Sequence, residues 1–163
     1  MKSAIAYLVG EAPYSQSRHY VDDFPKLEKE LADAYEVRTW RHRLHVDSEG
    51  RIVMPAMGFG NCIKSAAKRL KLQVPGMGRT EWTKYFEAGI MVVNGITLPI
   101  KAADAPCDKL FVSSTGQRGG PKRVTKYFPR IDAWEGEVTF FIFDDMITED
   151  VFRRVLVASG QIV

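Results

Sequence analysis

The segment YSQSRHYVDD, residues 14–23, gathers side chains that could move a proton. It places His19 between Arg18 and Tyr20, and Asp22 and Asp23 follow. A histidine or an aspartate can take a proton from an RNA 2′-hydroxyl group, and an arginine can hold the neighbouring phosphate. The same residues could hold a phosphate without reacting, or form a solvated loop whose aspartates cap the next helix. We keep Arg18 and His19 as candidate nucleic-acid contacts and expect no catalytic residue.

Known catalytic and metal-binding motifs are absent from the rest of the sequence. It contains no G-x-S-x-G, P-loop or H-E-x-x-H pattern. His42 and His45 lie three residues apart, which on a strand points them to opposite faces and makes them poor joint metal ligands. Cys62 and Cys107 are too few for a disulfide framework and have no zinc spacing, so we expect two reduced thiols. These patterns predict a protein without enzymatic activity, metal or cofactor.

Positive charge is concentrated in four segments, although the formal net charge is only +3. Lysine and arginine neutralise phosphates, and aromatic rings among them can stack on the bases of a single strand. The candidate nucleic-acid-binding residues are Arg18, His19, Arg38, Trp40, Arg41, Arg43, Lys64, Lys68, Lys71, Arg118, Lys122, Arg123 and Lys126. A solvated surface would explain any one segment alone. Together, with acidic residues enriched at 28–33 and 144–150, they favour one positive face that binds single-stranded nucleic acid.

The composition is that of an ordinary globular protein. The chain has 163 residues, of which 45% are hydrophobic and 26% charged, and this length suits a single domain over residues 1–163. No apolar stretch approaches the ~18–20 residues of a membrane span, and the first residues lack a signal-peptide pattern. We therefore expect a soluble, cytoplasmic protein with no membrane partner.

Hydrophobic periodicity predicts the elements that must position these side chains. In the first half we expect strands at 3–10, 36–46 and 51–55 and helices at 25–35 and 60–71. Turn residues at 47–50 would join two of these strands into a hairpin. In the helix at 60–71, Ile63, Ala67 and Leu70 form an apolar stripe, and the three lysines form a basic stripe of the same spacing.

The second half is predicted to hold a loop-rich segment at 73–89 and a hairpin at 90–100 around Asn94-Gly95. A partly irregular insertion at 101–123 would lead into a flexible, glycine-rich basic finger at 113–133. EVTFFIF, residues 137–143, is apolar on both faces, as a central strand would be. Thr148 would cap a helix that Gly160 ends, and residues 161–163 would begin a strand. This order predicts an α+β fold, a ferredoxin-like (RRM-like) core with hairpin or thumb insertions and a flexible insertion at about 100–130.

Three motifs together resemble the RAMP superfamily, especially the RNA-coating backbone subunits of CRISPR effector complexes. GRIVMPAMGFGNCIKSAAKRL, residues 50–70, is similar to that family's strand-Pro-small-small-helix signature. Ala56 stands where the family usually has glycine and Gly60 where it often has lysine, so the basic side chain would come from Lys64, one turn later. The basic finger before EGEVTFFIF and the closing DVFRRVLVASGQIV are similar to the family's late strand and last helix.

The resemblance implies an RNA-recognition core with a projecting hairpin thumb, whose copies stack head to tail along single-stranded RNA in antiviral defence. The sequence thus predicts a non-enzymatic protein that binds single-stranded nucleic acid, RNA by the resemblance, and oligomerises on it, in an RNA-guided or a phage or bacterial nucleoprotein complex. One alternative is a protein-interaction or inhibitory subunit that docks through its basic finger. A second is a ribonuclease that uses His19, Asp22 or Asp23.

Overall fold

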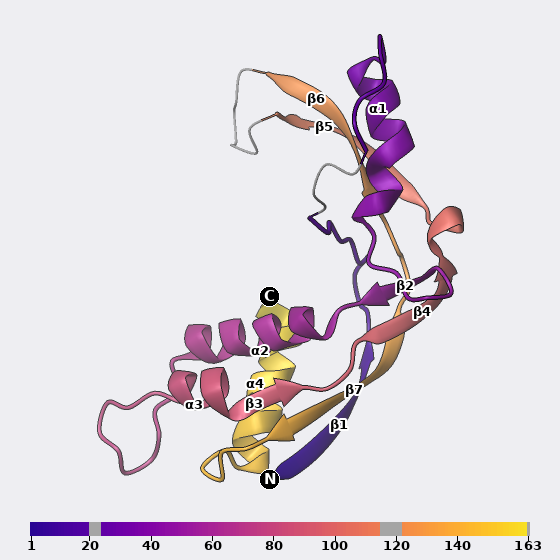
Figure 1. The fold of residues 1–163 in the computed structure, drawn as a ribbon. Helices are drawn as coiled ribbons and strands as arrows, with labels where there is room; N and C mark the ends of the chain where they lie inside the picture. The colour runs from indigo at the N-terminus through magenta and orange to yellow at the C-terminus, as the bar shows by residue number, and fades with distance from the viewer. Residues whose placement is uncertain (20–23, 115–121, 163) are drawn as a thin grey trace. The chain divides into compact units, whose positions relative to one another are not determined.

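The computed structural model describes residues 1–19, 24–114 and 122–162 (Figure 1). The fold is α+β, and the chain divides into two compact units. The first unit consists of Met1–Leu8, Met54–Ile96 and Gly136–Val163, and the second of Val9–Val53 and Thr97–Glu135. The sequence shows no linker between them because each unit is assembled from segments that lie far apart along the chain.

A three-stranded sheet forms the centre of the first unit. Its strands are β1 (Lys2–Val9), β7 (Glu135–Ile142) and β3 (Ile90–Val92), in the order β1-β7-β3. β3 runs antiparallel to β7, and Met91 lies opposite Phe141. The strands predicted at 3–10 and 137–143 are therefore confirmed, and the second is central, as its apolar sequence predicted.

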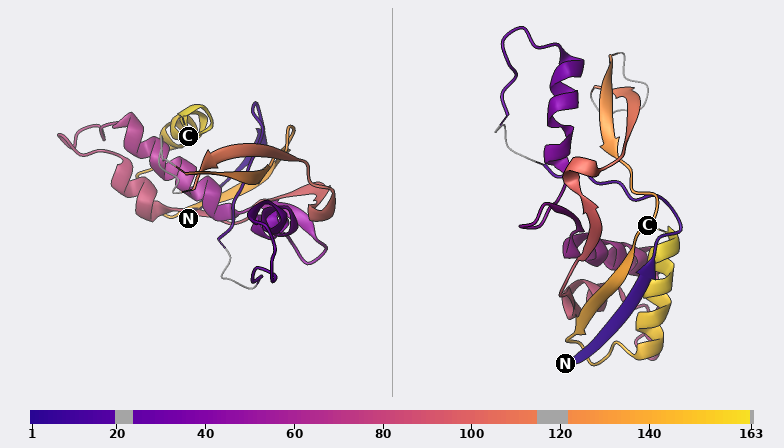
Figure 2. Two further views of the ribbon diagram at one scale, coloured as in Figure 1. Left: turned by 90° about the horizontal axis from the view of Figure 1, so that it is seen from above. Right: turned by 90° about the vertical axis from the view of Figure 1, so that its right-hand side faces the viewer.

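Three helices complete the first unit: α2 (Ala56–Leu70), α3 (Thr83–Gly89) and α4 (Glu149–Ile162) (Figure 2). Alternate residues of β7 (Val138, Phe140 and Ile142) are buried. The ring centroids of Phe140 and Phe152 are 5.4 Å apart, which joins the sheet to α4. α2 contributes Ile63, Ala66 and Ala67 to the same core.

The predicted ends of these helices were only partly right. α2 begins earlier than expected, directly after Pro55, whose fixed φ suits a helix start. The loop-rich segment at 73–89 contains α3, which the sequence pattern did not indicate. Thr148 caps α4 as predicted, since its Oγ1 accepts the N–H of Val151 at 3.4 Å. Gly160 does not end α4, and residues 161–162 are helical rather than the start of a strand.

The predicted hairpin at 90–100 is wrong. β3 pairs with β7, whereas β4 (Ile96–Lys101) pairs with β2 (Arg51–Met54). The Asn94 amide explains this, because it donates to the carbonyl of Glu137 at 2.8 Å and accepts the N–H of Thr139 at 2.8 Å. A Cβ on Gly95 would lie 2.1 Å from the Met54 carbonyl oxygen, so only glycine fits this close approach. Asn94-Gly95 is therefore a corner held by β7 and not a two-residue hairpin turn.

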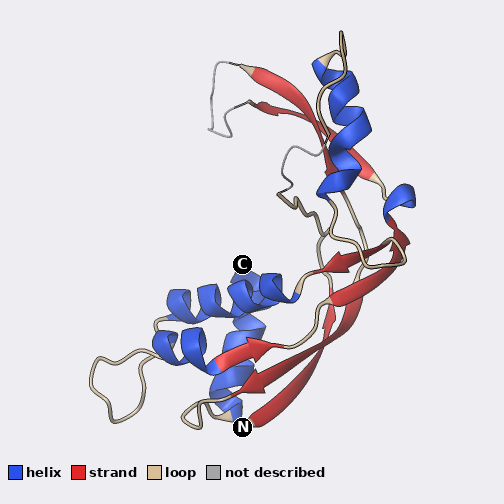
Figure 3. Cartoon of the chain, in the orientation of Figure 1, coloured by secondary structure: helices blue, strands red, loops and turns tan. Residues whose placement is uncertain are grey.

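A long hairpin and a helix beside it characterise the second unit (Figures 1 and 3). β5 (Cys107–Ser113) and β6 (Arg123–Pro129) are antiparallel, and α1 (Ala32–Thr39) lies beside β6. A short 3₁₀ helix, η1 (Trp40–Arg43), continues from α1, and another, η2 (Ala102–Asp104), precedes β5. The insertion expected to be partly irregular thus contains a regular strand, β5. The unit's buried side chains include Trp40, Leu44, Ile52, Leu98 and Ile131.

Two predictions for residues 25–46 are corrected. The strand expected at 36–46 is wrong, since its first eight residues belong to α1 and η1. The buried residues Glu36, Thr39 and Trp40 have helical spacing, and the alternation of apolar and polar residues was misleading. The helix expected at 25–35 begins only at Ala32. The return strand at 51–55 is confirmed as β2, and Val46 forms a single bridge with Ile52 across the 47–50 turn.

Candidate nucleic-acid interface

The first unit carries a row of lysines on α2, which we call the lysine stripe: Lys64, Lys68 and Lys71. Lys64 and Lys68 lie four residues apart on one side of the helix, next to its buried stripe, and Lys71 follows directly after the last helical residue. Lys68 and Lys71 are exposed and Lys64 is half-buried. Within the described residues no carboxylate forms an ion pair with these lysines, and residues 56–80 contain no acid. The stripe is therefore an uncompensated row of positive charge.

Part of the stripe also serves the helix itself. Lys68 lies in the last turn of α2, where a cation interacts favourably with the helix dipole. Lys71 ends the helix in the left-handed conformation, with φ of 48°. These roles use the charge of Lys68 and the backbone of Lys71, and they leave the ammonium groups available to a phosphate.

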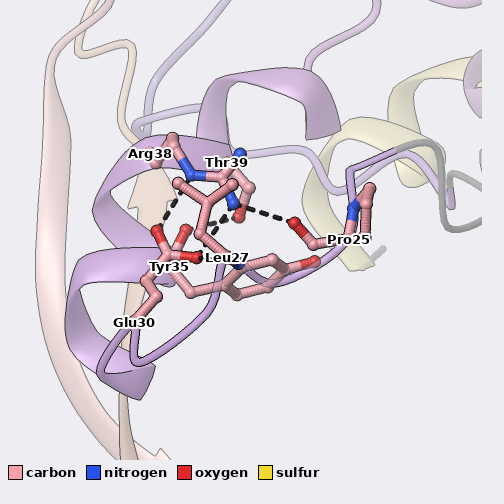
Figure 4. Close-up of polar contacts among 6 residues, drawn as sticks. All are labelled: Pro25, Leu27, Glu30, Tyr35, Arg38 and Thr39. Atoms are coloured by element: carbon pink, nitrogen blue, oxygen red, sulfur yellow. Dashed lines mark hydrogen bonds and ion pairs between the residues drawn. The ribbon is translucent and has the colours of Figure 1, made fainter.

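In the second unit, the Arg38 side chain forms hydrogen bonds with nearby residues of the same segment. Its guanidinium forms two hydrogen bonds of 2.9 Å with the Glu30 carboxylate and donates to the Pro25 carbonyl at 3.1 Å (Figure 4). Hydrogen bonds from Arg38 and from the Leu27 N–H lower the pKa of Glu30 to about 2. This network folds residues 25–31 into an irregular turn, which explains why α1 starts late.

Arg43 and Lys126 share a buried carboxylate, and we call this group the Glu36 cluster. Glu36 is only 3% exposed. Its oxygens accept hydrogen bonds from Arg43, from Lys126 Nζ at 3.0 Å and from the Tyr127 N–H at 3.2 Å. Burial raises the pKa of Glu36, but the hydrogen bonds from Arg43, Lys126 and Tyr127 outweigh it and leave the pKa below its ordinary value. The cluster ties α1 and η1 to β6 and neutralises two predicted nucleic-acid contacts.

The remaining predicted contacts of residues 18–43 differ in availability. Trp40 is 2% exposed and belongs to the core, so it offers no ring to a base. The exposed Arg41 guanidinium lies 4.4 Å from the Trp40 ring centroid. Arg18 and His19 are exposed, and the Arg18 backbone N–H donates to the Arg43 carbonyl at 2.7 Å. Tyr20, Asp22 and Asp23 lie outside the described residues, so the acid-base group expected around His19 is described only in part.

The basic finger is divided between exposed and paired cations. Lys122 and Arg123 are exposed where β6 begins. Arg130 forms ion pairs with Asp132 at 2.7 Å and Asp108 at 3.2 Å, and Lys126 belongs to the Glu36 cluster. Arg118 lies outside the described residues. Of the finger's described cations, Lys122 and Arg123 are thus the most accessible.

Sequence reasoning missed Phe111, whose side chain is 64% exposed in the middle of β5. Lys109 lies two residues before it, and the Lys109 ammonium is 5.9 Å from the Tyr127 ring centroid. The alternation in KLFVS could have revealed this, since it puts Lys109 and Phe111 on one side of a strand. The segment's glycines and its expected irregularity hid the signal.

A shallow hollow of about 290 Å³ lies on the other side of this hairpin. Its lining is mostly apolar, and its charged members, Asp108 and Arg130, are paired with each other. The residues around it are Pro13, Tyr14, Ser15, Asp108, Leu110, Val112, Phe128, Pro129 and Arg130. The charges of this lining are paired with each other, and its polar side chains, those of Tyr14 and Ser15, do not identify a ligand.

The described residues form neither a cluster of metal-ligating side chains nor a helix long and apolar enough to span a membrane. No group of three or more His, Cys, Asp or Glu side chains there is arranged to hold a metal ion. No helix in the same ranges combines the length and the apolar composition needed to cross a bilayer. Cys62 and Cys107 are free thiols, and burial raises the pKa of Cys62.

The chain matches no protein-family model, no curated protein and no solved structure.

Proposed function

We propose that this protein is a non-enzymatic single-stranded nucleic-acid-binding protein, and that its ligand is RNA. The observation that carries the proposal is the lysine stripe, two cations on one side of α2 and a third at its C-cap, without a carboxylate partner among the described residues. Neighbouring cations that have no carboxylate partner can neutralise successive phosphates of a nucleic acid. Exposed Arg18, Arg41, Lys122 and Arg123 would supply further phosphate contacts.

The topology of the first unit supports a ferredoxin-like, RRM-like core. Its elements follow the order β1, α2, β3, β7, α4, with α3 added before β3. In a β-α-β-β-α-β motif the third strand of the motif lies between the first two, and β7 lies between β1 and β3. With this core and the β5–β6 hairpin of the second unit, we propose a backbone-type subunit that oligomerises along its ligand, as the resemblance to RNA-coating subunits implies.

The test is binding of a fluorescein-labelled ~30-nucleotide single-stranded RNA, measured by anisotropy across a salt titration. The variant replaces Lys64, Lys68 and Lys71 with glutamine. Its matched control replaces Lys26, Lys29 and Lys101, which are all exposed. The match is close because each set contains one lysine with left-handed backbone: Lys71 with φ of 48° and Lys29 with φ of 62°.

Loss of three phosphate contacts should reduce the slope of log K against log salt by about 2, which is roughly a 50-fold weaker affinity near 0.15 M salt. The control should bind like the wild type. Equal slopes for the two variants would contradict the assignment to α2. Failure of the wild type to bind RNA, DNA or duplex at low salt would instead favour the protein-docking alternative. Sedimentation velocity of the RNA mixture tests oligomerisation, which predicts particles that grow with oligonucleotide length.

A further inference from the structure

The outer side of the β5–β6 hairpin presents an aromatic ring between cations. The register pairs Lys109 with Tyr127, Phe111 with Thr125, and Ser113 with Arg123. Because side chains alternate along a strand, these six residues share one side of the hairpin. Leu110 and Val112 point to the opposite side and line the hollow there. We call Lys109, Phe111, Arg123 and Tyr127 the Phe111 face.

The exposure and charge of the Phe111 face distinguish it from an ordinary surface. Phe111 is 64% exposed, which leaves most of a large apolar ring in water. Lys109 and Arg123 are both exposed, one on each side of Phe111 along the hairpin. Neither described strand places a carboxylate on this side. α1 brings one carboxylate to its edge, since Asp33 accepts a hydrogen bond from Thr125 Oγ1 at 3.3 Å.

The hairpin that carries this face is fixed in place within its unit. The Glu36 cluster holds β6 through Lys126 and the Tyr127 N–H. The hydrogen bond between Thr125 and Asp33 adds a second link from β6 to α1. Both links join α1 to β6, and β6 is paired with β5, so the strand pair that carries the Phe111 face is fixed before any ligand arrives.

We propose that the Phe111 face stacks on the bases of single-stranded nucleic acid, while Lys109 and Arg123 contact the flanking phosphates. This inference rests on the proposed function and names a contact surface for it. Aromatic rings stack on any base, and successive bases of a single strand are accessible in a way that paired bases are not. Lys109 lies two residues, about 7 Å, before Phe111 on β5. Arg123 lies equally far before Thr125, the residue of β6 that pairs with Phe111. Lys109 and Arg123 form no ion pair with any carboxylate of the described residues, so the positive charge on both sides of the ring complements a phosphate chain rather than a neutral protein surface.

The experiment uses the full chain, the same ~30-nucleotide single-stranded RNA and its duplex form. Phe111→Ala should weaken single-strand binding roughly 5- to 150-fold with an unchanged salt slope, because stacking releases no counterions. Phe111→Trp should retain the affinity, since a larger ring still stacks. Leu110→Ala is the matched control: it removes a side chain that is 48% exposed on the same strand but on the other side, and it should bind like the wild type.

Each other outcome overturns the inference in a recognisable way. RNA binding that depends on the lysine stripe but is unaffected by Phe111→Ala refutes the stacking surface and leaves the proposed function intact. Absence of wild-type binding refutes both. A change in the sedimentation of RNA-free protein on Phe111→Ala, without a change in RNA affinity, identifies the face as a protein contact instead.

Discussion

Removal of the Glu36 carboxylate should destabilise the protein strongly. In Glu36→Ala, three donors lose their acceptor: Arg43, Lys126 and the Tyr127 N–H. The Arg43 side chain is 13% exposed and cannot be fully hydrated, whereas Lys126, at 39%, can turn to water. An unsatisfied buried donor costs about 1–3 kcal/mol, and a buried ion pair that loses one partner costs about 3–5 kcal/mol.

The lost contact with Lys126 costs little, because water can hydrate that ammonium group. We therefore expect Glu36→Ala to lower the free energy of unfolding by about 3 kcal/mol. Glu36→Gln keeps an oxygen for one donor and should lose about 2 kcal/mol. Equilibrium urea unfolding at pH 7 measures both. The control is Glu28→Ala: Glu28 is exposed and forms no ion pair within the part of the chain that the structure describes, so this variant should stay within about 0.5 kcal/mol of wild type. A loss below about 0.5 kcal/mol for Glu36→Ala would refute the claim that this carboxylate holds α1 and η1 against β6.

Low pH should destabilise the protein through protonation of the Glu36 carboxylate. The pKa of Glu36 is lower in the folded protein than its ordinary value, so its contribution to stability is complete above the unfolded-state pKa of about 4.3. That contribution is lost as the pH falls through the folded-state pKa. Unfolding free energy of the wild type should therefore fall more steeply below about pH 5 than that of Glu36→Gln. Parallel curves for the two proteins would argue against the assigned charge.

Three further predictions follow from single contacts. The carboxyl carbon of Glu30, followed by NMR, should titrate near the pKa of about 2 that Arg38 and the Leu27 N–H impose, and Arg38→Gln should return it toward the ordinary value; equal titration in both proteins would contradict the geometry. Gly95→Ala should lower the Tm, since its Cβ would meet the Met54 carbonyl at 2.1 Å. Gly58→Ala, whose Cβ meets nothing within 4 Å inside α2, should gain about 0.5–1 kcal/mol, and a loss would be evidence against that helix.

The elements that the sequence predicted correctly are those with a complete local signal. β7 is a continuous apolar run, and α4 combines the Thr148 cap with a full apolar stripe. The segment at 36–46 failed because its conformation depends on partners far along the chain, above all the contact between Glu36 and Lys126. Asn94-Gly95 failed for a related reason, since β7 captures the Asn94 side chain and overrides a strong local turn preference.

The sequence indicated which residues could form the candidate site, but not which of them are accessible to a ligand. Positive side chains can be counted in a sequence, and the lysine stripe follows directly from helical spacing. Which cations are already neutralised is a tertiary property, as the pairing of Arg38 with Glu30 and of Lys126 with Glu36 shows. Burial of Trp40 and exposure of Phe111 likewise reversed the expected aromatic contact, because burial depends on the neighbouring elements and not on residue type.

The division into two units has a consequence for how this chain folds and how it can be dissected. The polypeptide passes from one unit to the other at Leu8–Val9, Val53–Met54, Ile96–Thr97 and Glu135–Gly136. No continuous fragment consists of one unit alone, so truncation cannot release either unit free of segments of the other. β1 must find β7 across most of the chain, and such non-local pairing slows folding because loop closure precedes the contacts that reward it. A shortened chain, in which linkers join the segments of one unit and replace those of the other, is therefore the practical route to studying each unit alone.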